Sequence, residues 1–123
     1  VAPYAMSSGS DILLISDGAL WRAHASLECL RTSPLFGSSL AANGYEKSPS
    51  GRIMQWGTQT LPASATTTFS FPIAFPNGCL SIVATFGTPA QGSVNADMVS
   101  PTQFKLQNLY AGAQAARWIA VGN

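Results

Sequence analysis

The sequence predicts an all-β fold, a small antiparallel β-sandwich preceded by an extended hairpin. Short runs of β-branched and aromatic residues are separated by Gly, Pro, Asn and Ser throughout the 123 residues, a pattern typical of all-β domains. The helical spacing of apolar residues does not extend beyond two turns anywhere in the chain. The length suits one domain with its own hydrophobic core and a short appendage.

The composition is poor in charge. Only 9% of the residues are charged and 46% are hydrophobic, whereas roughly 25% of residues are charged in an average soluble domain. One interpretation is an exterior of uncharged Ser, Thr, Asn and Gln. The other, which we favour, is that part of the apolar surface is buried between subunits, as in obligate oligomers.

The N-terminal part predicts a hairpin. Residues Ile12–Ile15 and Ala19–Arg22 flank the turn dipeptide Asp17-Gly18, in which Gly accepts a positive φ. Strands this apolar need burial on both faces, which an isolated hairpin cannot provide in water. Ser26–Leu30 could form one helical turn, and Ser33–Asn43 has the composition of a connection. We therefore expect an N-terminal shaft-like segment over residues 1–41 and a globular domain over 42–123.

The globular part contains five clear candidate strands at fairly even spacing, which suits a small sandwich. Cys79–Phe86 is the most hydrophobic of them and is expected to lie at the centre of a sheet, followed by a polar loop at Gly87–Asn95. The candidates are Gly51–Thr58, Thr66–Phe71, Cys79–Phe86, Phe104–Leu109 and Ala116–Val121.

Three blocks between residues 39 and 123 carry a resemblance to a known family. SLAANGYEKSPSGRIMQWG at 39–57, TFSFPIAFP at 68–76 and WIAVGN at 118–123 resemble, in this order, segments of the C-terminal domain of phage tail fibres. The first block is the most specific. Three positions depart from the usual pattern: Ser48 replaces a Leu, Arg52 an aliphatic residue and Asn123 a terminal Tyr. Arg52 therefore stands at a subunit contact or at the surface, or it displaces one core position.

The resemblance implies a fibre tip that acts outside the cell on a virion or a phage-derived tailocin particle. It implies a homotrimer, so that two identical chains are the first partners. The further partner is a bacterial surface glycan, such as lipopolysaccharide, or an outer-membrane protein. A purely structural trimerisation or capping module is the alternative, and a depolymerase fragment is a weaker one.

Glycan sites on β-sandwiches commonly lie in loops, which the sheets position while their own sequence varies. Two segments qualify, Gly87–Met98 and Asn108–Gln114, and Tyr110 is the best aromatic candidate because the small residues after it should leave its ring exposed. The candidate receptor-binding residues are Gln91, Ser93, Asn95, Asp97, Asn108, Tyr110 and Gln114.

Catalysis is not supported by the residues available. A glycosidase needs two carboxylates about 5–10 Å apart, and of the five acidic residues only Glu46 and Asp97 stand in the globular part; whether they converge is open. The one histidine, His24, lies beside the hairpin, although three copies could meet on a trimer axis.

No cofactor, metal site, nucleic acid or membrane insertion is expected either. The six basic residues form no stripe that would bind nucleic acid, and the apolar runs are too short to span a bilayer. A bridge between Cys29 and Cys79 is an open possibility, although one pair of cysteines is no disulfide framework.

Overall fold

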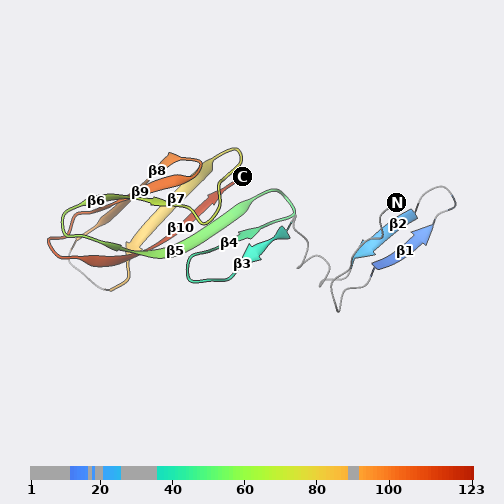
Figure 1. Ribbon diagram of the computed structural model, residues 1–123, viewed down its shortest axis with the longest axis horizontal. Coiled ribbons are helices and arrows are strands. Elements are labelled where there is room, and N and C mark those ends of the chain that lie inside the picture. The colour runs from blue at the N-terminus through green and yellow to red at the C-terminus, as the bar shows by residue number, and fades with distance from the viewer. Residues whose placement is uncertain (1–11, 17, 19–20, 26–35, 89–91) are drawn as a thin grey trace. The chain divides into compact units, whose positions relative to one another are not determined.

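The computed structural model describes residues 12–16, 18, 21–25, 36–88 and 92–123. The chain divides into two compact units, residues 1–37 and 38–123, shown in Figure 1. The second unit thus begins at Ser38, somewhat before the expected position 42. Each unit is described by itself below.

The N-terminal unit contains the predicted hairpin. Strand β1 (Ile12–Ser16) pairs antiparallel with β2 (Trp21–Ala25), from Ile12 opposite Ala25 to Ser16 opposite Trp21. Gly18 has a φ of 90°, the left-handed conformation for which glycine was expected here. The hairpin is confirmed over the described residues, in which the second strand is Trp21–Ala25; Ala19 and Leu20 lie outside them. The expected helical turn at Ser26–Leu30, which includes Cys29, lies outside the described residues.

The second unit is a sandwich of two antiparallel sheets, as the sequence predicts. One sheet has five strands in the order β3-β4-β5-β10-β7, and the other has three in the order β6-β9-β8 (Figure 1). The described residues contain no α-helix. The strands are β3 (Ser38–Ser39), β4 (Gly44–Lys47), β5 (Ile53–Leu61), β6 (Thr66–Ser70), β7 (Cys79–Phe86), β8 (Val94–Ser100), β9 (Gln103–Asn108) and β10 (Gln114–Gly122).

The position expected for the most hydrophobic strand is wrong. Strand β7 has the predicted bounds, Cys79–Phe86, but it lies at the edge of the five-stranded sheet, and β5 and β10 occupy its middle. Ile82, Ala84 and Phe86 pack against the core, whereas Val83 on the opposite face is 57% exposed. Strand β7 therefore has apolar side chains on both of its faces, and only one of these faces packs against the sandwich core.

Strand β8 was expected to be part of a loop. Its sequence, VNADMVS, includes Asn, Ala and Asp, which are depleted in strands. Residues Val94–Met98 nevertheless pair in regular register with Asn108–Phe104 of β9, and the register shifts before Ser100. The ladder to β9 and the burial of alternate residues thus override the weak intrinsic preference. Strands β3 and β4 were not predicted either: β3 falls in the expected connection Ser33–Asn43, and Gly44–Lys47 was not among the candidate strands.

Aromatic rings fill the space between the two sheets. The Phe71 ring lies 4.8 Å from Phe104 and 4.9 Å from Phe75, and the Phe104 ring lies 4.5 Å from Trp118. All four side chains are buried. Trp118 is thus a core residue, and Arg52 is exposed, in keeping with its departure from the aliphatic pattern.

One polar side chain inside the core joins the sheets. Gln55 of β5 is fully buried; its Nε2 donates to the Ile73 carbonyl at 2.9 Å, and its Oε1 accepts from the Ile73 amide at 3.0 Å. The same connecting segment is tied to the β8–β9 turn, because the Phe75 amide donates to the Pro101 carbonyl at 2.9 Å. The segment between β6 and β7 is therefore fixed to both sheets.

Candidate functional site

Three connections meet at one end of the sandwich. They are the β5–β6, β7–β8 and β9–β10 connections, and their described residues, 62–65, 87–88, 92–93 and 109–113, are called the loop end below. The Leu109 amide donates to the Ser93 carbonyl at 3.0 Å, and the Ser64 amide donates to the Tyr110 carbonyl at 2.9 Å. The two segments that the sequence singled out for binding thus come together.

The loop end lies opposite the point where the chain comes into this unit. Ser38 pairs with Glu46 of β4, whose neighbour Lys47 pairs with Ile53 at the start of β5. The β5–β6 connection follows the other end of β5. The C-terminus lies at the same end as Ser38, because the Asn123 carbonyl accepts from the Asn77 amide at 2.7 Å, between β6 and β7. Preceding residues therefore join this unit away from the loop end.

Asn108 holds the loop end together from inside. It is 1% exposed; its Nδ2 donates to the Pro62 carbonyl at 2.8 Å and to the Gly112 carbonyl at 3.0 Å. Its Oδ1 accepts from the Tyr110 amide at 2.8 Å. Asn108, one of the predicted binding residues, is therefore buried, and its amide group makes its hydrogen bonds within the chain. It positions the loops and does not face a ligand.

Tyr110 is half-buried, although its ring was expected to be exposed. Glycines lie against it on two sides: a Cβ added to Gly92 would stand 2.9 Å from the Tyr110 Cβ, and one added to Gly112 would stand 2.8 Å from Cε1. Gly92 also has a φ of 153°. Small residues around Tyr110 thus let neighbouring backbone approach the ring and do not simply uncover it.

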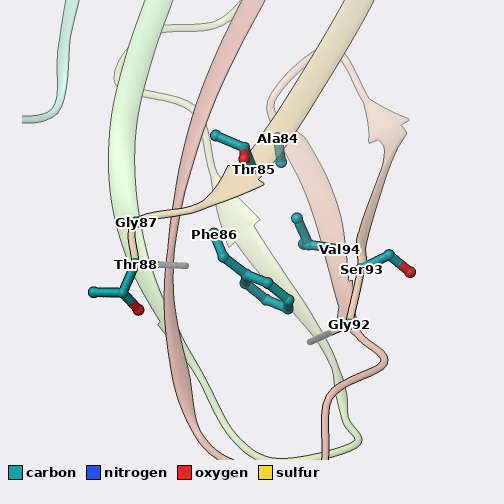
Figure 2. Close-up of a pocket in the computed structure, with 8 residues that line it drawn as sticks. All are labelled: Ala84, Thr85, Phe86, Gly87, Thr88, Gly92, Ser93 and Val94. Carbon is teal, nitrogen blue, oxygen red and sulfur yellow. The ribbon is translucent and has the colours of Figure 1, made fainter. Parts of the chain in front are cut away.

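Ser93, another predicted loop residue, borders a depression of about 510 Å³ between β7 and β8. Residues Ala84–Thr88 and Gly92–Val94 line it, and Figure 2 shows the Phe86 ring and the Val94 side chain in the space between these segments. Ser93 is exposed, and the Gln114 Oε1 accepts from the Thr88 hydroxyl at 3.0 Å. Gln91 lies outside the described residues.

Asn95 and Asp97 belong to a different surface, the outer face of the three-stranded sheet. The Asp97 Oδ2 lies 3.0 Å from Lys105 Nζ on β9, and Asn95 Nδ2 donates to Gln107 Oε1 at 3.2 Å. The hydrogen bond from Lys105, together with its charge, lowers the pKa of Asp97 below its usual range. Sequence reasoning missed Lys105 and Gln107, although the alternation of polar residues along β6 and β9 signals one solvent-facing side.

The outer face of the five-stranded sheet carries one row of apolar side chains beside a polar row of Thr58, Arg117 and Thr85. Ile119 of β10 stands directly opposite Trp56 on β5 and Val83 on β7. Ile119 is 40% and Val83 57% exposed, and Trp56 is half-buried. The Trp56 indole reaches the connection between β3 and β4, where its Nε1 donates to the Ala41 carbonyl at 3.2 Å. These three side chains are called the apolar row.

The two carboxylates that could have formed a glycosidase pair lie in different sheets, Glu46 on β4 and Asp97 on β8. Within the described ranges, no three His, Cys, Asp or Glu side chains gather closely enough to hold a metal ion.

Cys79 is buried with a free thiol, and burial raises its pKa. No described helix has the length and hydrophobicity to cross a membrane.

Residues 47–123 match the family described as "Putative tail fiber protein gp53-like, C-terminal". Solved tail fibres of pyocins are similar in structure over 71% of this chain. An N-truncated R2-type pyocin fibre has a TM-score of 0.66 at 30% identity, with 37% of that chain covered. A C-terminal fragment of the Pseudomonas aeruginosa R2 fibre has a TM-score of 0.67 at 30% identity, with 25% covered.

An N-truncated R1-type pyocin fibre has a TM-score of 0.57 at 32% identity, and 84% of that chain is covered. This chain therefore spans well under half the length of the two R2 fibres it matches. No curated protein sequence matches it.

Proposed function

Because the chain belongs to the gp53-like family of tail fibre C-terminal domains, we propose that it is the receptor-recognition tip of a fibre on a phage or tailocin particle. The receptor is a bacterial surface glycan, such as lipopolysaccharide, or an outer-membrane protein. Recognition proceeds without catalysis, and the tip carries the particle to its host by binding alone.

The arrangement of the loop end is the observation that carries this proposal. Ser93, Tyr110 and their neighbours converge at the end of the sandwich opposite Ser38, where preceding residues join. Within this unit, the loop end is therefore the end far from the connection to the preceding residues, which supports a role in contacting another surface. Loops held by a rigid scaffold are where binding residues concentrate, and Asn108 supplies this rigidity from inside.

The same proposal includes assembly as a homotrimer through the apolar row. A row of half-buried Trp56 with exposed Ile119 and Val83, on a chain with few charges, favours contact with another protein surface. In a trimer, the row would face the other two chains and leave the loop end free. Three linked copies would also strengthen weak binding, because the second and third contacts become intramolecular.

The trimer is tested by light scattering on the purified 123-residue chain and on Ile119→Lys. We expect the mass of three chains for the native sequence and of one chain for Ile119→Lys, because a buried, unpaired ammonium group is costly. Val99→Lys is the matched control, since Val99 is 49% exposed on β8 of the other sheet, and it should remain a trimer. A monomeric native chain would overturn this part of the proposal.

A purely structural capping module is the second candidate, favoured by the same apolar row. It predicts trimers that bind no cell. Incubating the fluorescently labelled chain with a panel of Gram-negative strains separates the two, because a recognition tip labels some strains saturably. A depolymerase would instead release oligosaccharide from purified surface polysaccharide, and we expect no release.

A further inference from the structure

The outer face of the three-stranded sheet consists of polar side chains arranged in rows. The strand registers align Thr66 of β6 with Gln107 of β9 and Asn95 of β8. A second row consists of Thr68, Lys105 and Asp97, in the same strand order. Neighbouring strands lie about 4.8 Å apart and residues two apart on one strand about 6.7 Å apart. The face thus repeats hydroxyl, amide and charged groups at the scale of a sugar ring.

Two cross-strand contacts hold this face in place. Asn95 Nδ2 donates to Gln107 Oε1 at 3.2 Å, and Lys105 Nζ lies 3.0 Å from Asp97 Oδ2. In the described part of the chain, Asn95 Oδ1 and Gln107 Nε2 have no further partner. One acceptor and one donor, each fixed by the other half of its amide, therefore point to solvent side by side.

A depression of about 340 Å³ lies over these groups. Thr66, Asn95, Asp97, Lys105 and Gln107 line it, together with Ala96. Its size lies at the lower end of the range for small-ligand sites. The depression combines free hydroxyl and amide groups with a cation and an anion that already neutralise each other.

We propose that this depression binds one or two residues of a neutral, hydroxyl-rich polysaccharide of the bacterial surface. This inference rests on the proposed function, of which it names the ligand class and a site. Vicinal sugar hydroxyls act as donors and acceptors at once, and they match the paired acceptor Asn95 Oδ1 and donor Gln107 Nε2. A paired Lys105 and Asp97 give no net charge to attract a polyanion, which disfavours strongly acidic polymers.

The chemistry of this depression predicts weak binding at each single site. Each hydrogen bond to the sugar replaces one to water, so the net gain per bond is modest. No aromatic ring lines the depression to stack on the sugar. Binding at one site should therefore be weak, and useful retention on a cell would require several linked sites.

The test uses the labelled 123-residue chain and a panel of Gram-negative strains that includes Pseudomonas aeruginosa. The variant Asn95→Ala/Gln107→Ala removes the amide pair. Gln103→Ala is the matched control, because Gln103 is an exposed glutamine on the same strand but does not line the depression. We expect at least tenfold weaker half-saturation for the double variant and less than twofold for the control, with unchanged unfolding curves for both.

Treatment of the cells separates the receptor classes. Periodate, which cleaves vicinal diols of glycans, should abolish labelling, and a protease should not. Loss after protease alone, or equal binding by the double variant and the control, would overturn this inference and leave the proposed function standing. Labelling of no strain would overturn the proposed function and the inference with it.

Discussion

Replacing Gln55 tests the claim that one buried amide fixes the β6–β7 connection to the five-stranded sheet. In Gln55→Met the side-chain volume is nearly conserved, so packing alone should cost little. The amide and carbonyl of Ile73, now bonded at 3.0 and 2.9 Å, both lose their partner. An unsatisfied buried backbone group costs about 1–3 kcal/mol, and Ile73 is half-buried. We expect the free energy of unfolding to fall by about 2–4 kcal/mol.

The assay is urea unfolding followed by tryptophan fluorescence at one fixed chain concentration, because assembly would make stability concentration-dependent. Gln59→Met is the control: Gln59 lies on the same strand and face but is half-buried and makes no side-chain hydrogen bond to a described residue. Its effect should stay within about 0.5 kcal/mol. A loss below about 1 kcal/mol for Gln55→Met, or equal losses for both variants, would refute the reasoning.

Three further predictions concern single residues. In a Cys29→Ser background, the Cys79 thiol of the folded protein should react with Ellman's reagent at pH 8 more slowly than the same thiol in the urea-unfolded chain, because burial raises its pKa and the thiolate is the nucleophile; equal rates would contradict this. The depressed pKa of Asp97 means that its contact with Lys105 stabilises the fold above the ordinary Asp pKa of about 4, and that this contribution is lost as the pH falls through the folded value. Urea unfolding of Asp97→Asn and the native chain should accordingly differ slightly at pH 7 and converge in acid, and a gap that widens in acid would exclude the contact. Gly57→Ala should lower the free energy of unfolding by about 1–3 kcal/mol, because the added Cβ would collide with Asn43 Oδ1 and would stand 2.9 Å from the buried Trp118 indole. Unfolding curves that overlay would contradict this and show that both side chains move aside without cost.

The strands that alternate apolar and polar residues could be predicted from the sequence alone. Thr66–Ser70 appears close to the expected bounds, because the pleat places alternate side chains on opposite faces. Cys79–Phe86 also has the expected bounds, although it does not alternate, because a short run rich in apolar residues is bounded by turn residues. The order of the strands in each sheet could not be predicted. The hydrophobicity of Cys79–Phe86 suggested a central strand, but part of that apolar surface lies on the outer face of an edge strand.

The candidate site was predictable only in part. The two polar segments do converge at the loop end, but the sequence could not distinguish Asn108, buried under the loops, from Ser93 at the surface. Reading β8 as a loop also hid the pairing of Asp97 with Lys105. The first depends on the approach of Pro62 and Gly112 to Asn108 and the second on the register between β8 and β9, and no local pattern of residues encodes either.

The central claim is that this domain chooses the bacterial surface to which its fibre binds. The direct measurement replaces the part of an R2-type pyocin fibre that matches this chain with residues 38–123 and determines which strains the chimeric particle kills. A recognition tip predicts killing of strains outside the range of the parent particle, lost in the Asn95→Ala/Gln107→Ala chimera. A chimera that keeps the range of the parent particle would contradict the claim and leave the domain a structural cap.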